Sequence, residues 1–110
     1  MIDGLKIVSI VYSNEGEKIM IYIYVHHTVE DYATWRKGFD EHASARQAAG
    51  ATDEVYVMQT LDNTNDITAI LGWSDMEKAN AFIQSPELKE AMQKAGVTGP
   101  PEIRYLKAAE

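Results

Sequence analysis

Three side chains of this 110-residue sequence, His27, His42 and Arg46, have the types and spacing to move a proton and hold the resulting anion. His42 and Arg46 are four residues apart, so a helix places both on one face. A neutral imidazole, with an unperturbed pKa of ~6.5, can act as a general base at neutral pH, and a guanidinium can bind a carboxylate, phenolate or enolate. For His42 the alternative is a structural hydrogen bond. For Arg46 it is solvent exposure or a pair with Asp53 or Glu54.

An aromatic stripe continues the face that carries His42 and Arg46. Tyr32, Trp35 and Phe39 precede them at spacings of three and four residues, which is the period of an amphipathic helix. Core packing explains such a stripe, but a flat indole with one N–H donor also suits the wall of an aromatic binding site. With core packing as the alternative, the residues that we predict to contact a ligand are Tyr32, Trp35, Phe39, Met58, Trp73 and Phe82.

Hydrophobic periodicity and turn residues predict the elements that position these side chains. The helix of the stripe spans 31–50, with Thr28 as its N-cap, Asp31 returning the capping bond and Gly50 as its terminating residue. Runs rich in β-branched and aromatic residues predict strands at 5–12, 18–27, 54–61, 67–73 and 102–107. A capping box at 74–77 predicts a second helix, which Ser85 and Pro86 restart and Gly96 ends.

The order of these elements predicts an α+β fold. A βαββαβ order is typical of a ferredoxin-like sandwich, in which two helices cover one face of a four-stranded antiparallel sheet. The strand at 5–12 is additional to this order. We therefore divide the chain into an N-terminal extension at 1–17, containing an extra strand and a loop, and a ferredoxin-like domain at 18–110.

Both faces of the predicted sheet are apolar. In the strand at 18–27, isoleucines and a valine alternate with a methionine and two tyrosines. A sheet with one solvated face alternates apolar and polar residues instead. Two helices cover only one face, and the other would expose a larger apolar patch than a monomer usually has. We therefore predict a homodimer whose sheets pack face to face, with coverage by the N-terminal extension as the alternative.

Composition limits the partners and the location. The net charge is −7 and the Lys and Arg residues are scattered, which argues against nucleic acid or an anionic membrane as a partner. The absence of cysteine excludes disulfides, thiolate zinc sites and cysteine nucleophiles. We expect no cofactor and no metal, because Gly-rich phosphate loops and zinc motifs are absent and Asp40 and His42 diverge on a helix. Without an apolar run near ~20 residues or a signal peptide, we expect a cytoplasmic protein.

A family resemblance lies in two runs, "VHHTVEDYATWRKGFDEHASARQAAG" and "GWSDMEKANAFIQSPELKEAMQKAGVTGPPEI". They resemble small proteins of the dimeric α/β-barrel superfamily, near the antibiotic-biosynthesis-monooxygenase-like and cyclase-like members, and the resemblance covers residues 19–107. It implies that residues 18–110 form a dimeric α/β-barrel domain with a cavity between the helices and the sheet of each protomer. It also favours His27 over His26 as the histidine on the helix side.

The resemblance implies a fold more narrowly than a reaction, because the superfamily includes cofactor-free monooxygenases, haem-degrading enzymes and isomerases. The second predicted helix holds no histidine that could be an axial haem ligand. We expect a cofactor-independent monooxygenase or an isomerase/cyclase that acts on a small aromatic or polyketide-like metabolite. His27 or His42 would remove a proton and Arg46 would hold the anion. The alternative is a non-catalytic small-molecule-binding or stress-response dimer.

Overall fold

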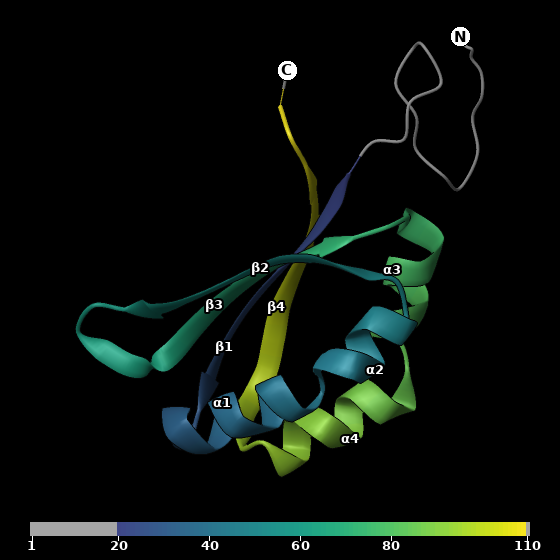
Figure 1. Cartoon of the computed structure of the whole chain (residues 1–110). Helices are drawn as coiled ribbons and strands as arrows, with labels where there is room; N and C mark the ends of the chain where they lie inside the picture. Colours follow the sequence, from purple (N-terminus) through teal and green to yellow (C-terminus); the bar gives the residue numbers. More distant parts are fainter. Residues whose placement is uncertain (1–19, 110) are drawn as a thin grey trace, which may run out of the picture.

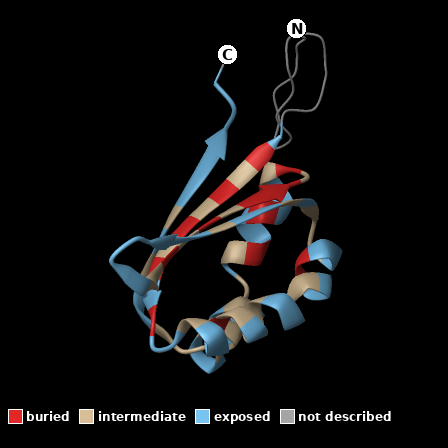
Figure 2. Ribbon diagram, turned by 60° about the vertical axis from the view of Figure 1, so that its left-hand side comes forward, coloured by how far each residue is buried: buried red, intermediate tan, exposed pale blue. Residues whose placement is uncertain are grey.

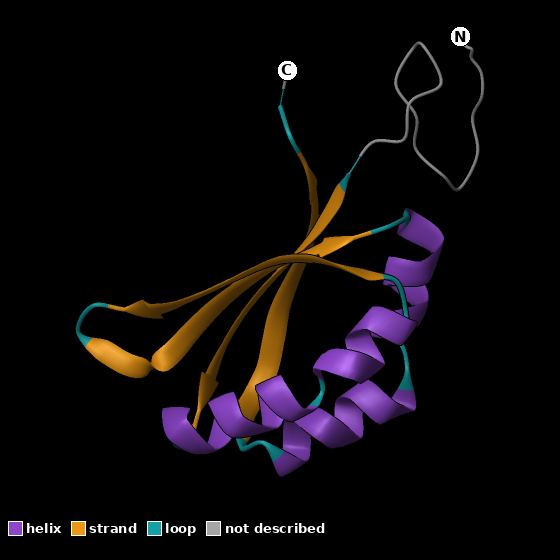
Figure 3. Cartoon of the chain, in the orientation of Figure 1, coloured by secondary structure: helices purple, strands orange, loops and turns teal. Residues whose placement is uncertain are grey.

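The computed structural model describes residues 20–109, which form a four-stranded antiparallel sheet with helices on one face (Figures 1 and 3). The elements in chain order are β1 (Ile21–Val29), α1 (Tyr32–Glu41), α2 (Ala43–Ala48), β2 (Ala51–Thr60), β3 (Asn63–Trp73), α3 (Met76–Ile83), α4 (Pro86–Lys94) and β4 (Val97–Lys107). The strand order is β2-β3-β1-β4. This arrangement confirms the predicted α+β, ferredoxin-like fold. The predicted strand at 5–12 and the extension at 1–17 lie outside the described residues.

The core lies between the sheet and the helices and is built on the two central strands, β1 and β3. Figure 2 shows that buried residues follow these strands. The buried residues that pair across them are Ile21 with Trp73, Ile23 with Leu71, and Val25 with Ala69. Because side chains alternate along a strand, His27 lies on this same face, and it is also buried. The placement of His27 on the helix side is therefore confirmed.

The first helical segment begins and breaks at unexpected positions. Asp31 is its N-cap, accepting a hydrogen bond from the backbone N–H of Thr34 at 3.0 Å, so the prediction of Thr28 as the cap is wrong. Thr28 remains in β1, where its hydroxyl lies 2.6 Å from the hydroxyl of Thr98. The helix is interrupted at His42, whose φ of −87° and ψ of 2° separate α1 from α2. His42 therefore occupies a junction between two helices.

The second helical segment consists of two capped helices. Asp75 accepts a hydrogen bond from the backbone N–H of Lys78 at 2.8 Å and caps α3, one residue after the predicted position. Ser85 accepts a hydrogen bond from the backbone N–H of Leu88 at 3.2 Å, and Pro86 is the first residue of α4. The predicted restart of the helix at Ser85 and Pro86 is confirmed.

The last strand is longer than the prediction of 102–107, because β4 already begins at Val97. Its first residues include glycine and two prolines, a composition that is typical of a loop. However, among residues 20–109, β4 pairs only with β1 and forms one edge of the sheet. The N–H groups on its outer side need no strand partner, so proline is tolerated there. The error therefore comes from the position of β4 in the sheet, which the local sequence does not encode.

The face of the sheet away from the helices carries exposed apolar side chains. Tyr56, Met58 and Leu106 are on this face and are 51%, 47% and 39% exposed. Among them lie Tyr22, Tyr24 and Ile70, which are partly buried in the single chain. We call this surface, formed by Tyr22, Tyr24, Tyr56, Met58, Ile70 and Leu106, the open face.

Within the described part of the chain, no helix is long and apolar enough to cross a membrane.

Candidate functional site

A small cavity of about 70 Å³ lies between the helices and the sheet, and it brings most of the predicted site residues together. The predicted residues that line it are His27, Trp35, Phe39, His42, Arg46 and Phe82. They come from β1, α1, the α1–α2 junction, α2 and α3. The remaining walls are apolar side chains of the sheet and of α4. The cavity is therefore an apolar chamber into which a few polar groups converge, as in many small-molecule sites.

One wall of the chamber is a column of four stacked side chains. The guanidinium carbon of Arg46 lies 3.8 Å from the centroid of the Phe39 ring. Phe39 stacks on Trp35 with their ring centroids 5.0 Å apart. Trp35 in turn meets the His27 ring edge-on at 5.5 Å. The i, i+4 spacing of Trp35 and Phe39 on α1 produces the central stack, and the column places a cation at one end and an imidazole at the other.

Arg46 is a buried cation without an acidic partner among residues 20–109. It is 7% exposed, and its one hydrogen bond there runs from Nη1 to the backbone oxygen of Phe39 at 2.7 Å. The neighbouring carboxylate of Asp40 instead accepts a hydrogen bond from Nε of Arg36 at 3.1 Å. Burial lowers the pKa of Arg46 below its usual value, although the guanidinium stays protonated. Four of its five N–H donors thus have no protein acceptor in the described part of the chain.

Neither alternative for Arg46 fits this placement. Arg46 is only 7% exposed, so full solvation does not explain its position, and Glu54 accepts a hydrogen bond from the hydroxyl of Tyr22 at 2.9 Å on the opposite face. Asp53 and Arg46 both border a second hollow of about 110 Å³ next to β2, but their side chains form no ion pair there. The guanidinium therefore separates an apolar chamber from a more polar hollow.

His27 is the second polar group in the chamber. It is 7% exposed, and its Nδ1 is buried without a hydrogen-bond partner in the described structure. Burial lowers the pKa of His27 below its ordinary value, so the imidazole is neutral at neutral pH. A buried polar atom without a partner is costly, so this nitrogen favours a hydrogen-bond partner that the described residues do not supply. A neutral imidazole facing a cavity also has the protonation state of a general base.

His42 lies at the boundary between the chamber and a neighbouring groove. Its backbone N–H donates to the carbonyl of Gly38 at 3.1 Å, which closes the last turn of α1. Its ring lies 6.4 Å from the ring of Phe82, measured between centroids. Both residues line the chamber and also a groove of about 460 Å³ between α2 and the α3–α4 segment. His42 is half-buried, so it can exchange protons with solvent more readily than His27 can.

Three of the predicted ligand contacts lie outside the chamber. Trp73 is fully buried behind Phe82, with ring centroids 4.6 Å apart, and its Nε1 donates to the carbonyl of Ala49 at 3.0 Å. Tyr32 lies beside the column, with its ring centroid 6.0 Å from that of Trp35. Met58 is on the open face, because it pairs with Thr68 in the register of β2 and β3. Met58 therefore does not line the chamber.

The chamber wall on α4 was not among the predicted site residues. Leu88, Ala91, Met92 and Ala95 line the chamber at helical spacings. Gly38 of α1 allows α1 and the end of α4 to approach closely, because a Cβ at this position would already lie 3.4 Å from the Cβ of Ala95. The apolar period of α4 could have indicated this wall, but the period does not identify what the helix faces.

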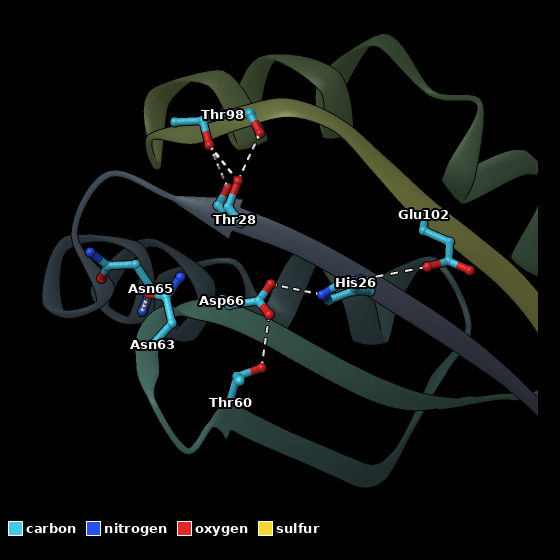
Figure 4. Close-up of polar contacts among 8 residues, drawn as sticks. All are labelled: His26, Thr28, Thr60, Asn63, Asn65, Asp66, Thr98 and Glu102. Carbon is cyan, nitrogen blue, oxygen red and sulfur yellow. Dashed lines mark hydrogen bonds and ion pairs between the residues drawn. The ribbon is translucent and has the colours of Figure 1, made fainter.

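The open face carries a different polar cluster, drawn in Figure 4. Nε2 of His26 lies 2.7 Å from Asp66, and its Nδ1 lies 3.5 Å from Glu102. Asp66 also accepts a hydrogen bond from the hydroxyl of Thr60 at 2.8 Å, and Glu102 pairs with Arg104 at 2.8 Å. The hydrogen bond to Asp66 is the main cause that raises the pKa of His26. Within residues 20–109, no group of three or more histidines and carboxylates has the geometry of a metal site.

Fold and chamber together define a class: a small ferredoxin-like domain with an apolar, cation-containing cavity between its helices and sheet. Solved structures with this fold include SnoaB, a cofactor-independent oxygenase from Streptomyces nogalater (17% identity, 84% of this chain and 95% of that chain, TM-score 0.68). The ActVA-Orf6 monooxygenase of Streptomyces coelicolor, solved with nanaomycin D, is also similar (19% identity, 84% and 89%, TM-score 0.59). A candidate antibiotic biosynthesis monooxygenase of Bordetella bronchiseptica gives a TM-score of 0.71 at 16% identity, over 84% and 100%.

These matches confirm the fold expected from the resemblance, because the chain shares it with monooxygenase and oxygenase structures. No family model and no curated protein matches the sequence. At identities of 16–19%, these structural matches show a shared fold but do not show a shared reaction.

Proposed function

We propose that this protein is a cofactor-independent monooxygenase that oxygenates a small aromatic metabolite in the chamber between its helices and its sheet. The observation that carries the proposal is Arg46, a permanent cation that is 7% exposed and has no carboxylate partner among residues 20–109. Burying an unpaired charge costs several kcal/mol. An oxyanion on the substrate, held by the free N–H donors of Arg46, would offset this cost.

His27 is the general base in this proposal. Its neutral imidazole takes a proton from an acidic C–H or O–H group of the substrate, and Arg46 holds the enolate or phenolate that results. The anion transfers electrons to dioxygen, and a carbon–oxygen bond forms. For a substrate with an acidic methylene group, the methylene and one dioxygen become a carbonyl and one water. The substrate supplies all the electrons, and His42 on the groove side can exchange the protons with solvent.

Two of the structural neighbours support this choice of reaction class. The Streptomyces nogalater protein is a cofactor-independent oxygenase, and the Streptomyces coelicolor protein is a monooxygenase crystallised with the ligand nanaomycin D. Stacked Trp35 and Phe39 provide flat apolar surfaces suited to an aromatic substrate here as well. Isomerisation or cyclisation would use the same base and cation without dioxygen, and the consumption of dioxygen separates these reactions.

The active assembly in this proposal is a homodimer formed through the open face. Among the described residues, helices cover only one side of the sheet (Figure 1), and the apolar side chains on the other side are up to 51% exposed. Burial of apolar surface contributes roughly 25 cal/mol per Å² before the costs of association. A second copy presents the same apolar surface, so the two faces are complementary in character. The chamber lies on the opposite side of each sheet and stays accessible.

The test is dioxygen consumption by the purified protein with a panel of phenols and aromatic ketones of one to three rings, without added metal or cofactor. We expect turnover of at least one compound, with Arg46→Gln reducing kcat/KM by ~100-fold or more because the anion loses its partner. Arg36→Gln is the matched control, since Arg36 lies on the adjacent helix but its guanidinium binds Asp40 outside the chamber. It should retain near-normal turnover.

Two results would contradict the proposal. If Arg46→Gln turned over substrate as fast as the parent protein while remaining folded, the cation would have no role in the reaction. If the parent protein bound compounds of the panel but consumed no dioxygen with any of them, the protein would instead be a binding protein or an isomerase. Circular dichroism of each variant establishes that the fold is retained.

A further inference from the structure

The chamber in this structure is smaller than the aromatic ring that the proposed substrate carries. A protein cavity that binds benzene has a volume of ~150 Å³, and the chamber has about 70 Å³. Side chains in protein interiors are already close-packed, so a ring does not gain space by compressing the walls. At least one wall must therefore move when a ring binds.

The walls contributed by the sheet, α1 and α3 are held in place by their own packing. On α1, Trp35 and Phe39 are stacked on each other with ring centroids 5.0 Å apart. On α3, Phe82 packs against the fully buried Trp73, with ring centroids 4.6 Å apart. The sheet wall consists of buried side chains of the two central strands, Val25, Ala69 and Leu71. Displacing any of these walls would disrupt the core.

The wall on α4 has free space behind it. No residue of α4 is fully buried in the described structure. A hollow of about 620 Å³ lies on the other side of this helix, against the first half of β4. We call it the β4 hollow, and its lining includes Ile83, Leu88, Met92, Val97, Pro101 and Ile103. The first three of these also line the chamber, so they stand between the two spaces.

Met92 is the most adaptable of the three side chains that the two spaces share. Ile83 is β-branched and ends α3, and such a side chain has one strongly preferred χ1 rotamer in a helix. Leu88 also lines the groove beside α2, so it belongs to a third boundary. Methionine is unbranched, has three rotatable bonds and fills irregular spaces at little cost. Met92 can therefore turn away from the chamber without a shift of the backbone.

The β4 hollow is suited to a displaced thioether. Val97, Pro101 and Ile103 form an apolar surface across from α4, and each is half-buried. The charged side chain of Lys89 lies at the exposed rim of the hollow. Contact with the apolar surface keeps the displaced side chain out of water, and burial of the ring in the chamber supplies the net gain.

From these observations we infer that Met92 is the residue that determines the size of the ligand. When a ring enters the chamber, the side chain of Met92 turns into the β4 hollow and the ring takes its place, with its oxygen at Arg46. A methionine side chain is smaller than an aromatic ring, so the space that it leaves, added to the chamber, admits one ring but not two fused rings. The inference rests on the proposed function in placing the ligand in the chamber, and it adds the substrate class and a specificity-determining residue.

The experiment is calorimetric titration of the full-length protein with two probes, phenol and 1-naphthol. We expect the parent protein to bind phenol at least ~10-fold more tightly than 1-naphthol, because a second ring would overpack the chamber. Met92→Ile keeps an apolar side chain but stiffens it, so phenol affinity should fall by ~10-fold or more. Met92→Ala enlarges the chamber permanently, so it should remove the preference for phenol and bind 1-naphthol at least ~10-fold more tightly than the parent does.

A matched control and a direct readout accompany these variants. Met58→Ile makes the same substitution on the open face, away from the chamber and the β4 hollow, and it should bind both probes as the parent protein does. In protein labelled with methyl-¹³C methionine, addition of phenol should shift the methyl signal of Met92 and strengthen its nuclear Overhauser effects to Val97 and Ile103. The methyl signal of Met58 should stay in place. Circular dichroism establishes that each variant is folded.

The inference is overturned if folded Met92→Ile binds phenol as tightly as the parent, if Met92→Ala keeps the parent's preference for phenol, or if neither the parent nor Met92→Ala binds phenol. A Met92 methyl signal that stays in place in the phenol complex would also overturn it. These outcomes are distinct from failure of the proposed function, because binding is measured without turnover. A protein that shows the expected order of affinities but never consumes dioxygen would retain the adaptable wall and lose the oxygenase assignment. An active oxygenase that is indifferent to Met92 would show the reverse.

Discussion

Two adjacent residues of β1, His26 and His27, meet opposite environments on the two faces of the sheet. His26 lies between two carboxylates, Asp66 and Glu102, and its side chain is 37% exposed. His27 is 7% exposed, and its Nδ1 has no partner within residues 20–109. Hydrogen bonding to Asp66 raises the pKa of His26, and burial lowers the pKa of His27. The alternation of the strand alone separates these two environments by one residue.

The same contrast holds for the arginines of the two faces. Arg104 on the open face donates from Nε to Glu102 at 2.9 Å, and its Nη2 forms an ion pair with the same carboxylate at 2.8 Å. Arg46 on the helix side has a ring and a carbonyl as its neighbours but no carboxylate in the described structure. One face thus satisfies its own charges, while the other leaves a cation and an imidazole unsatisfied. Polar groups that a protein leaves unsatisfied in a cavity are available to a ligand, which is why we place the function on the helix side.

The strongest effect is expected from Arg46→Met, which removes the unpaired charge from the helix side. Ligand affinity or kcat/KM should fall by ~100-fold, while the free energy of unfolding should rise by ~1 kcal/mol, because the desolvation cost disappears and an apolar chain fills the space. Urea unfolding and titration of the same samples measure both quantities. Arg104→Met, on the exposed surface, should leave ligand affinity unchanged. A loss of stability above ~2 kcal/mol in Arg46→Met would make Arg46 a structural residue.

The second prediction compares two neighbours on β2 that point to opposite faces. Tyr56→Lys places a charge in the open face, and we expect the dissociation constant of the dimer to rise by ~100-fold, because burying a lysine there costs several kcal/mol. Val55→Lys is the matched control, since Val55 is 39% exposed on the other side of the same strand. It should leave the dimer intact. Sedimentation at micromolar concentration measures both variants, and a parent protein that sediments as a monomer would remove the predicted homodimer.

The third prediction concerns the pH dependence of the free energy of unfolding, to which the two histidines should contribute with opposite signs. The folded-state pKa of His26 is raised. The contribution of His26 to the free energy of unfolding is therefore present below the unfolded-state pKa of ~6.5 and is lost as the pH rises through the folded-state pKa. The folded-state pKa of His27 is lowered, so its contribution is present above ~6.5 and is lost as the pH falls through the folded value. NMR titration of the imidazoles, assigned with His26→Asn and His27→Asn, measures both. Equal pKa values for His26 and His27 would refute the contrast between the two faces of the sheet.

The sequence contained enough information for the fold and for one wall of the chamber. Strand alternation and the helical spacing of Trp35, Phe39, His42 and Arg46 are local patterns, and the last four all line one cavity. Which residues share a strand face or a helix face follows from backbone geometry alone, so such predictions need no tertiary information.

The missed features depend on contacts between distant segments. Trp73 looked available to a ligand, but its N–H is bound by the carbonyl of Ala49, a residue 24 positions away. The prolines of β4 indicated a loop because nothing local reveals that this strand lies at an edge. Leu88 and Ala91 of α4 became chamber walls through the position of α4 against α1. Tertiary packing determines each of these, and single-sequence patterns do not contain it.

The smallest effect is expected from Thr60→Val, which changes only the outer end of the open-face cluster. The hydroxyl of Thr60 donates to Asp66 at 2.8 Å and is the main cause of the lowered pKa of that carboxyl. Without it, the pKa of Asp66 should rise toward its ordinary value, as carbon-detected NMR of the carboxyl group would measure. The pKa of His27 should change much less, because burial is the main cause of its shift and the charge of Asp66 on the other face is a minor one. A change at His27 as large as the change at Asp66 would mean that the two faces are strongly coupled.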